Sequence, residues 1–217
     1  MRAKYTKPFF LVLFILPADQ SLKFWIKLHM ALGQEYKLLG NWAIIHFTEN
    51  NGMAFGIELG GDAGKLALTL FRIVAVLSIG YGLIYLAKNK FHTGLIFGVA
   101  LIFAGALGNI IDSSFYGLLF SASDYESCAT LVPITHGYAD LFHGKVVDMF
   151  YFPILHGTFP PWMPFWAGEE FVFFRPIFNI ADAAISIGVV LVLIFQKKYY
   201  REEEGTPNYL NSEVIEE

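Results

Sequence analysis

The chain has 217 residues, of which 55% are hydrophobic and only 16% are charged, and its formal net charge is −4. Soluble domains are about 45–50% apolar and about 25% charged, so this composition excludes a disordered chain, a nucleic-acid binder and a polar repeat protein. A single cysteine, Cys128, cannot form an internal disulfide, which excludes a disulfide-stabilised secreted scaffold. The composition therefore predicts a membrane protein.

Four stretches are predicted to cross the membrane as helices, because a bilayer core requires roughly 20 apolar residues. The first stretch is interrupted by Asp19, Lys23 and Lys27, and its basic and apolar beginning also resembles a signal peptide. No small-residue cleavage site follows it in the sequence, so we expect a retained helix rather than a cleaved leader. The predicted spans are 9–32, 66–87, 91–111 and 177–195.

The distribution of basic residues predicts the orientation of these spans. Lysines and arginines gather near the N-terminus, at the turn Lys88–Lys90 and after the last span, and such residues mark the cytoplasmic side. Both termini are therefore expected in the cytoplasm, and the loops 33–64 and 112–176 are expected to face outward. The expected fold is an all-α membrane bundle in one domain, residues 1–200, followed by a flexible acidic tail, residues 201–217.

The two outer loops differ in character. In the first, two β-prone runs, 42–48 and 53–59, flank an Asn-Gly turn, a pattern that predicts a β-hairpin at the outer surface. The second loop is long and rich in aromatic residues and proline, so we expect Trp162 and Trp166 at the level of the lipid headgroups.

Several polar residues stand in or beside the predicted spans, where ionisable groups are costly and mark function. Asp19 and Lys23 are four residues apart and share a helix face, so they can pair, either as a structural lock or as part of a site. An Asn and an Asp three residues apart recur where the third span ends and where the fourth begins; these pairs are Asn109 with Asp112 and Asn179 with Asp182.

A third acid, Asp148, lies in an apolar run that is typical of a short strand or a re-entrant segment. A carboxyl group among Val, Met and Phe resists ionisation. Two such acids brought together can share a proton and activate a water molecule, one as general base and the other as general acid. The alternative is that these acids only cap helix ends near water.

A metal-dependent hydrolase is a further alternative. His136, Asp140 and His143 fall at helical spacing, and Asp148 and His156 follow them. Such side chains are good ligands for first-row metals, although the spacing matches no standard motif.

Five motifs in chain order resemble those of the lipoprotein signal peptidases (signal peptidase II), which are bacterial membrane aspartic peptidases. The motifs are Asp19-Gln20-x-x-Lys23, Asn50-x-Gly52-x-Ala54-Phe55-Gly56, Gly105-Ala-Leu-Gly108-Asn109-Ile-Ile-Asp112, Gly144-Lys-Val-Val-Asp148 and Phe178-Asn179-Ile-Ala-Asp182-x-x-Ile185.

The resemblance implies an enzyme that cleaves prolipoproteins carrying diacylglycerol on a cysteine, just N-terminal to that cysteine. It implies Asp148 and Asp182 as the catalytic pair. It implies neither cofactor nor metal, no nucleic-acid partner, a lipid-modified prolipoprotein as substrate, contact with membrane lipid, and a monomer in the bacterial inner membrane. The supporting and substrate-positioning residues that it implies are Asp19, Lys23, Asn50, Gly52, Asn109, Asp112 and Asn179.

The sequence departs from the family's pattern at two points. Ser113 follows Asp112 where the family has an arginine, and 36 positions separate Asp112 from Asp148, so that much of Ser113–His143 looks inserted. We expect Arg175, just before the fourth span, to supply the missing guanidinium. The competing class is a non-enzymatic transporter or lipid-binding scaffold, in which Asp19, Lys23 and Asp112 would line a continuous polar path.

Overall fold

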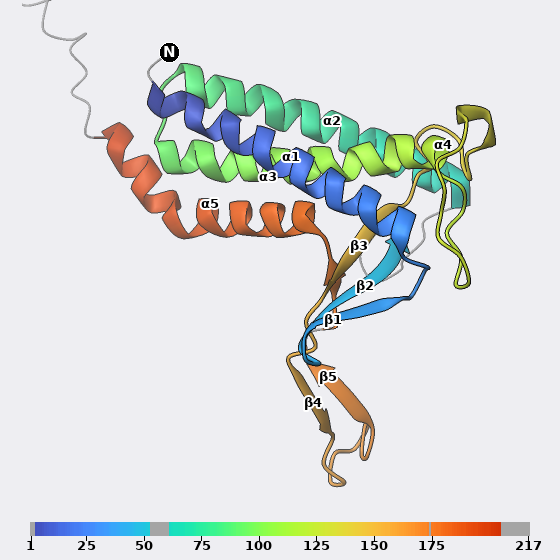
Figure 1. Ribbon diagram of the computed structural model, residues 1–217. Helices are drawn as coiled ribbons and strands as arrows, with labels where there is room; N and C mark the ends of the chain where they lie inside the picture. The colour runs from blue at the N-terminus through green and yellow to red at the C-terminus, as the bar shows by residue number, and fades with distance from the viewer. Residues whose placement is uncertain (1–2, 53–60, 174, 205–217) are drawn as a thin grey trace, which may run out of the picture.

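Four long helices lie alongside one another, and a small sheet leaves the bundle near one end (Figure 1). The computed structural model describes residues 3–52, 61–173 and 175–204. The sheet makes the fold a mixture of helices and strands, so the expectation of an all-α bundle was wrong: the long outer loops form strands. The helices are α1 (Ala3–His29), α2 (Gly61–Lys88), α3 (Thr93–Ile111) and α5 (Ile180–Glu204).

Three helices in the described part of the chain are long and apolar enough to cross a membrane, over Thr6–His29, Gly61–Lys88 and Thr93–Leu119. The third includes a π-helical turn, η2 (Asp112–Tyr116), and the short α4 (Gly117–Leu119), which continue α3 beyond Ile111. Helix α5 begins at Ile180, because Ile177 and Phe178 belong to a strand rather than to the helix, and its described apolar residues run from Ile180 to Ile194.

Helix α3 is the centre of the bundle and packs against α1, α2 and α5. Its contact with α5 is close because small residues face one another there: a Cβ atom at Gly105 would overlap the carbonyl oxygen of Ala181. Buried Ala104 and Ala184 lie in the same region. Small residues allow helices to approach closely in membranes, and here they bring the first turn of α5 against the last turns of α3.

The main sheet is antiparallel, with strand order β1-β2-β3-β6. The predicted strand 42–48 is confirmed as β2, which pairs with β1 on one edge and with β3 on the other. The run 53–59, its expected hairpin partner, lies outside the described residues. Thr48 of β2 stands opposite Asp148 of β3. The strands are β1 (Glu35–Leu39), β2 (Ala43–Asn50), β3 (Val146–Tyr151) and β6 (Ile177–Phe178).

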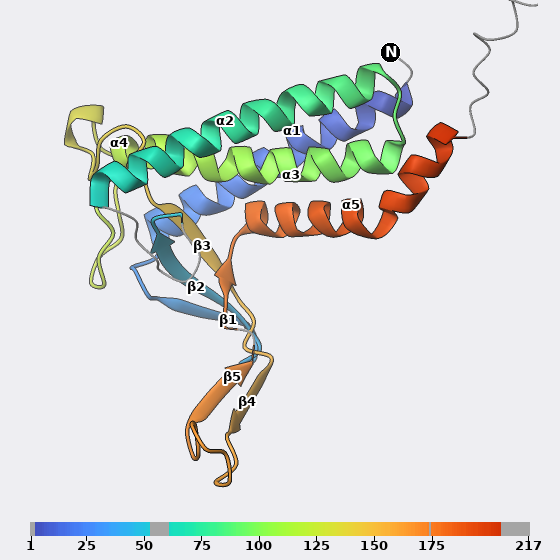
Figure 2. The same ribbon diagram turned by 180° about the vertical axis from the view of Figure 1, so that it is seen from behind.

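Two further features lie between α4 and α5. The segment after α4 contains a short 3-10 turn, η3 (Ile134–His136), and packs around a buried aromatic core that includes Tyr116 and Phe120. A second, two-stranded hairpin, β4 (Leu155–Thr158) with β5 (Glu170–Phe173), stands at the far end of the sheet (Figure 2). Helix α5 reaches Glu204, and the rest of the predicted tail lies outside the described residues.

Candidate active site

The first turn of α5 carries a reciprocal capping pair. The backbone N–H of Asp182 donates to Asn179 Oδ1 (2.9 Å), and the backbone N–H of Asn179 donates to Asp182 Oδ2 (3.3 Å). This is the capping-box arrangement, with Asn in the cap position and an acid three residues later. It fixes the Asp182 side chain at the helix N-terminus, where the helix dipole interacts favourably with a negative charge.

Asp148 comes from the middle of β3, so of the two expected alternatives, a short strand or a re-entrant segment, the structure has the strand. Its side chain is only 3% exposed and lies between the buried Val147 and Met149. Asn179 donates to its Oδ1 (2.7 Å), and Asn50 donates to its Oδ2. Burial, together with the charge of Asp182, raises the pKa of the Asp148 carboxyl from 3.8 to about 7, so this acid retains its proton up to near-neutral pH.

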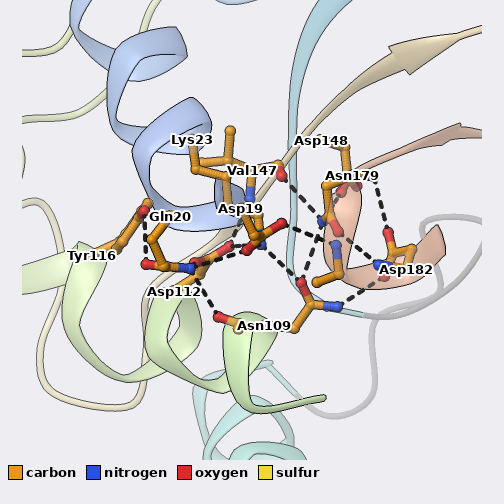
Figure 3. Close-up of polar contacts among 12 residues, drawn as sticks. Asp19, Gln20, Lys23, Asn109, Asp112, Tyr116, Val147, Asp148, Asn179 and Asp182 are labelled. Atoms are coloured by element: carbon orange, nitrogen blue, oxygen red, sulfur yellow. Dashed lines mark hydrogen bonds and ion pairs between the residues drawn. The ribbon is translucent and has the colours of Figure 1, made fainter. Parts of the chain in front are cut away.

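A chain of side-chain amides connects the two aspartates. Asn109 of α3 donates to Asp182 Oδ1 (2.8 Å), and the Asn179 amide lies 3.3 Å from Asn109 Oδ1. In Figure 3, Asp148 and Asp182 lie on either side of Asn179. Both asparagines therefore orient the acids by hydrogen bonds, although Asn109 bonds Asp182 rather than Asp112, the acid three residues along the chain. The two acids form one polar cluster drawn from β3, α3 and α5.

A second group of charges lies deeper between the helices. The Lys23 ammonium, which is fully buried, pairs with Asp19 Oδ2 and Asp112 Oδ2, both at 2.8 Å, and donates to Asn109 Oδ1 (3.0 Å). Asp19 also accepts a bond from the backbone N–H of Ala181 (3.0 Å). The predicted Asp19–Lys23 pair is thus confirmed, and it links α1 to α3 and to the first turn of α5.

Gly52 completes the cluster from the turn after β2. Its φ of +86° is in the left-handed region that favours glycine, and its N–H donates to the Asn50 side chain. The turn therefore holds the amide that contacts Asp148. With Gly52, the structure brings all nine residues named from the sequence into one connected network: Asp19, Lys23, Asn50, Gly52, Asn109, Asp112, Asp148, Asn179 and Asp182.

Three further members of this network are absent from the site residues named from the sequence, although Gln20 stands in the first motif. Gln20 donates to Asp112 Oδ1 (2.9 Å) and accepts from the Tyr116 hydroxyl (3.2 Å), and these two bonds join α1 to the turn η2. Arg72 of α2 donates to the Gly52 carbonyl, and the charge of Asp182 acts on its guanidinium. The available signal was a single arginine within the otherwise uncharged stretch 66–87.

Arg175, which the sequence suggested as the guanidinium of the site, is exposed on the approach to β6. Ser113 is buried in the π-helical turn, where its carbonyl accepts the N–H of Gly144 (2.8 Å). A buried position of this kind has little room for a long cationic side chain. The arginine that reaches the cluster among the described residues is Arg72.

The inserted segment packs against a second buried lysine. Lys27 pairs with Glu49, contacts Ser123 Oγ (3.0 Å) and lies 5.1 Å from the ring centres of Phe120 and Tyr138. The segment thus covers the C-terminal part of α1. Among the residues that the structure describes, no three His, Cys, Asp or Glu side chains form a group that could hold a metal, and this includes the alternative based on His136, Asp140 and His143.

Comparisons with known proteins found similar sequences and a similar fold. A family model described as signal peptidase (SPase) II matches residues 11–197. A lipoprotein signal peptidase of Porphyromonas gingivalis is 52% identical over 85% of this chain and 80% of its own length, and one of Amoebophilus asiaticus is 38% identical over 89% and 79%. A solved bacterial membrane enzyme has a similar fold, with a TM-score of 0.60 at 24% identity, covering 92% of this chain and 93% of that one.

Proposed function

The chain belongs to the signal peptidase II family, and we propose that Asp148 and Asp182 are the catalytic pair with which it removes signal peptides from prolipoproteins. The observation that carries this proposal is the placement of two acids, from β3 and α5, in one amide network. The substrate is a prolipoprotein with a diacylglyceryl group on its cysteine, and the cut falls N-terminal to that cysteine.

The two environments assign different roles to the acids. Asp182, at a helix N-terminus, is the general base that takes a proton from water, and the resulting hydroxide attacks the scissile carbonyl carbon. Asp148, which holds its proton because its pKa is raised to about 7, is the general acid. It donates that proton to the carbonyl oxygen as the hydroxide adds, which gives a tetrahedral gem-diol intermediate. When the intermediate collapses, Asp182 delivers the proton it took from water to the departing amine, and Asp148 takes a proton back from the gem-diol, so both acids return to their starting states. The acid form is lost as the pH rises above about 7, so the rate should fall there.

The position of the site suits a substrate held in the membrane. The beginning of α1, the α2–α3 turn and the C-terminal end of α5 lie at one end of the bundle, and the sheet lies toward the other (Figures 1 and 2). We assign the first end to the cytoplasm because it carries Lys7, Lys88 and Lys90. Helix α5 lies beside α3 and serves as the fourth span of this inner-membrane protein. The aspartates then face the outer side, where the lipid-modified cysteine lies.

Cleavage of a diacylglyceryl-modified prolipoprotein by the purified protein in detergent tests the pair. Asp148→Asn and Asp182→Asn should each lower the rate by at least about a hundredfold, because each removes a proton-transfer group. Asp140→Asn, an exposed acid of the inserted segment, is the matched control and should leave the rate unchanged. Cleavage that survives in either site variant would overturn the pair, and loss of activity in EDTA together with loss in Asp140→Asn would favour a metal hydrolase.

Arg72 is proposed to orient the substrate beside this pair. A guanidinium carries five N–H donors, and here it lies against the Gly52 turn with Asp182 in electrostatic reach. Arg72→Gln should raise KM or lower kcat by about tenfold or more, the effect of losing a charged hydrogen bond of about 1.5–3 kcal/mol. Arg175→Gln is the matched control, and equal losses in the two variants would contradict the assignment.

A further inference from the structure

The β4–β5 hairpin exposes large apolar side chains that no other described part of the protein covers. At its tip Trp162 is 79% exposed, Phe165 is 80% exposed and Trp166 is half exposed, and Leu155 and Phe173 on its strands are more than half exposed. An exposed apolar surface of this kind marks an interaction site, because leaving it in water is costly.

The tip is an ordered structure rather than a loose loop. The ring of Phe159 lies tilted against those of Trp166 (5.9 Å between ring centres) and Phe171 (4.9 Å), and the N–H of Gly168 donates to the Phe159 carbonyl (3.1 Å). Pro160, Pro161 and Pro164 lie in the same turn and restrict its backbone. The aromatic side chains are therefore presented on a preformed support, so that little conformational entropy is lost when a partner covers them.

The direction of the hairpin identifies that partner. The sheet leaves the bundle across the helix axes, and the hairpin tip lies level with the first turns of α5, short of the outer ends of α1 and α2 (Figures 1 and 2). For helices that stand along the membrane normal, this direction lies in the membrane plane. The hairpin therefore continues sideways at the depth of the bundle's own outer edge, where the lipid headgroups lie. Tryptophan, with an apolar ring and one N–H donor, is the residue that favours this layer.

We propose that the β4–β5 hairpin is an interfacial arm that lies in the outer headgroup layer of the membrane, with Trp162, Phe165 and Trp166 inserted among the lipids. The partner is the lipid surface itself. Two exposed charged residues of the arm, Glu169 and Glu170, lie at the start of β5.

The arm has a consequence for catalysis, which rests on the proposed role of the two aspartates. Along the chain the hairpin stands between Asp148 and Asp182: β3 leads through Pro153 into β4, and β5 leads into β6, which pairs with β3 and ends just before Asn179. A membrane-held arm therefore fixes, at one depth, both chain segments that carry the acids. The lipid surface sets the height of the catalytic pair relative to the membrane-embedded substrate.

Tryptophan fluorescence in vesicles tests the arm without any measurement of activity. In a Trp25→Phe/Trp42→Phe background the remaining tryptophans are Trp162 and Trp166. In phosphatidylcholine vesicles brominated in the upper half of the acyl chains, their emission should fall several-fold, and bromines in the lower half should quench less. The proposal would be overturned if bromolipids left the tryptophan emission unchanged while iodide in the aqueous phase quenched it. That result would mean that the arm lies in water or against a second copy of the chain.

A second variant tests the catalytic consequence. Trp162→Ser/Phe165→Ser/Trp166→Ser should lower kcat/KM in vesicles by about tenfold, while Tyr125→Ser, an equally exposed aromatic residue of the inserted segment, should leave it unchanged. If the tryptophans insert but the triple variant keeps wild-type kcat/KM, the coupling to the aspartates is wrong. These results are independent of the Asp148→Asn and Asp182→Asn assays, which test the catalytic pair alone.

Discussion

Two buried lysines stand one turn apart on α1, and they stabilise different parts of the molecule in different ways. Lys23 lies between two carboxylates, Asp19 and Asp112, and both acids are buried as completely as the lysine. Lys27 is equally buried but faces one carboxylate, Glu49, with a serine hydroxyl and two aromatic rings completing its surroundings. The inner group links the helices that carry the proposed active site, and the outer group holds the inserted segment.

The surroundings of the two lysines predict how much stability each group loses when its lysine is replaced. In the inner group, every donor around the two acids has a defined partner, including Gln20 and the backbone N–H of Ala181. Removing the ammonium there leaves two negative charges buried together. In the outer group, Glu49 also lies 3.8 Å from the half-exposed Lys145 and accepts from Ser123, so its charge keeps partners when Lys27 is lost. Replacing the lysine is therefore expected to destabilise the inner group more than the outer group.

The largest effect is expected from replacing each of the two lysines by methionine. Lys23→Met should lower the free energy of unfolding in detergent by about 3–5 kcal/mol, because it leaves uncompensated buried carboxylates, and cleavage should be lost with it. Lys27→Met, the matched variant, should cost about 1–3 kcal/mol, because Glu49 keeps other hydrogen bonds. It should retain most of the activity. Thermal unfolding and initial cleavage rates, measured on both variants, give the loss of stability and the loss of activity for each. Equal losses in the two variants would contradict the comparison.

The effect of Asp148 on the stability of the folded protein is expected to depend on pH. Its pKa is raised from 3.8 in the unfolded chain to about 7 in the folded protein, so between these values the unfolded chain releases the proton that the folded protein keeps. The folded state therefore loses stability as the pH rises from about 4 to 7, by roughly 1.4 kcal/mol per unit. Asp148→Asn removes this loss.

The stability of Asp148→Asn relative to wild type should thus increase by roughly 3 kcal/mol between about pH 5 and pH 8. Unfolding measured across this range in detergent gives the answer, with Asp140→Asn as the exposed control whose curve should parallel that of the wild type. An offset that stays constant with pH would show that Asp148 is not held protonated by its surroundings.

The sequence predicted the parts of the site that local geometry determines. Asn179 and Asp182 share a helix face because they are three residues apart, and the same rule pairs Asp19 with Lys23. The contact of Asn50 with Asp148 joins residues 98 positions apart, which no local pattern encodes; the resemblance to a family indicated both residues, but not their contact.

Other parts of the fold left no readable signal. Strand β1 is exposed at every position, so it lacks the alternation by which a half-buried strand is recognised. Arg72 was overlooked because one charge hardly changes the hydropathy of a long apolar stretch. The partners of Lys27 were missed because its helix face meets the inserted segment, whose position depends on tertiary packing.

The smallest effect is expected from removing the Ser123 hydroxyl, which tests how much burial strengthens a hydrogen bond in the outer group. Ser123 donates to Glu49 at 2.8 Å in a largely buried setting, and Ser127 makes the same hydroxyl-to-carboxylate bond to Asp124, also at 2.8 Å, in an exposed loop of the same segment. Ser123→Ala should lower the free energy of unfolding by about 1 kcal/mol, because a buried acceptor loses its donor and water cannot replace it. Ser127→Ala should change it by less than about 0.5 kcal/mol, since water reaches Asp124. Equal changes in paired unfolding measurements would mean that the inserted segment does not shield Glu49 from solvent, and that the outer group contributes no more than a surface contact.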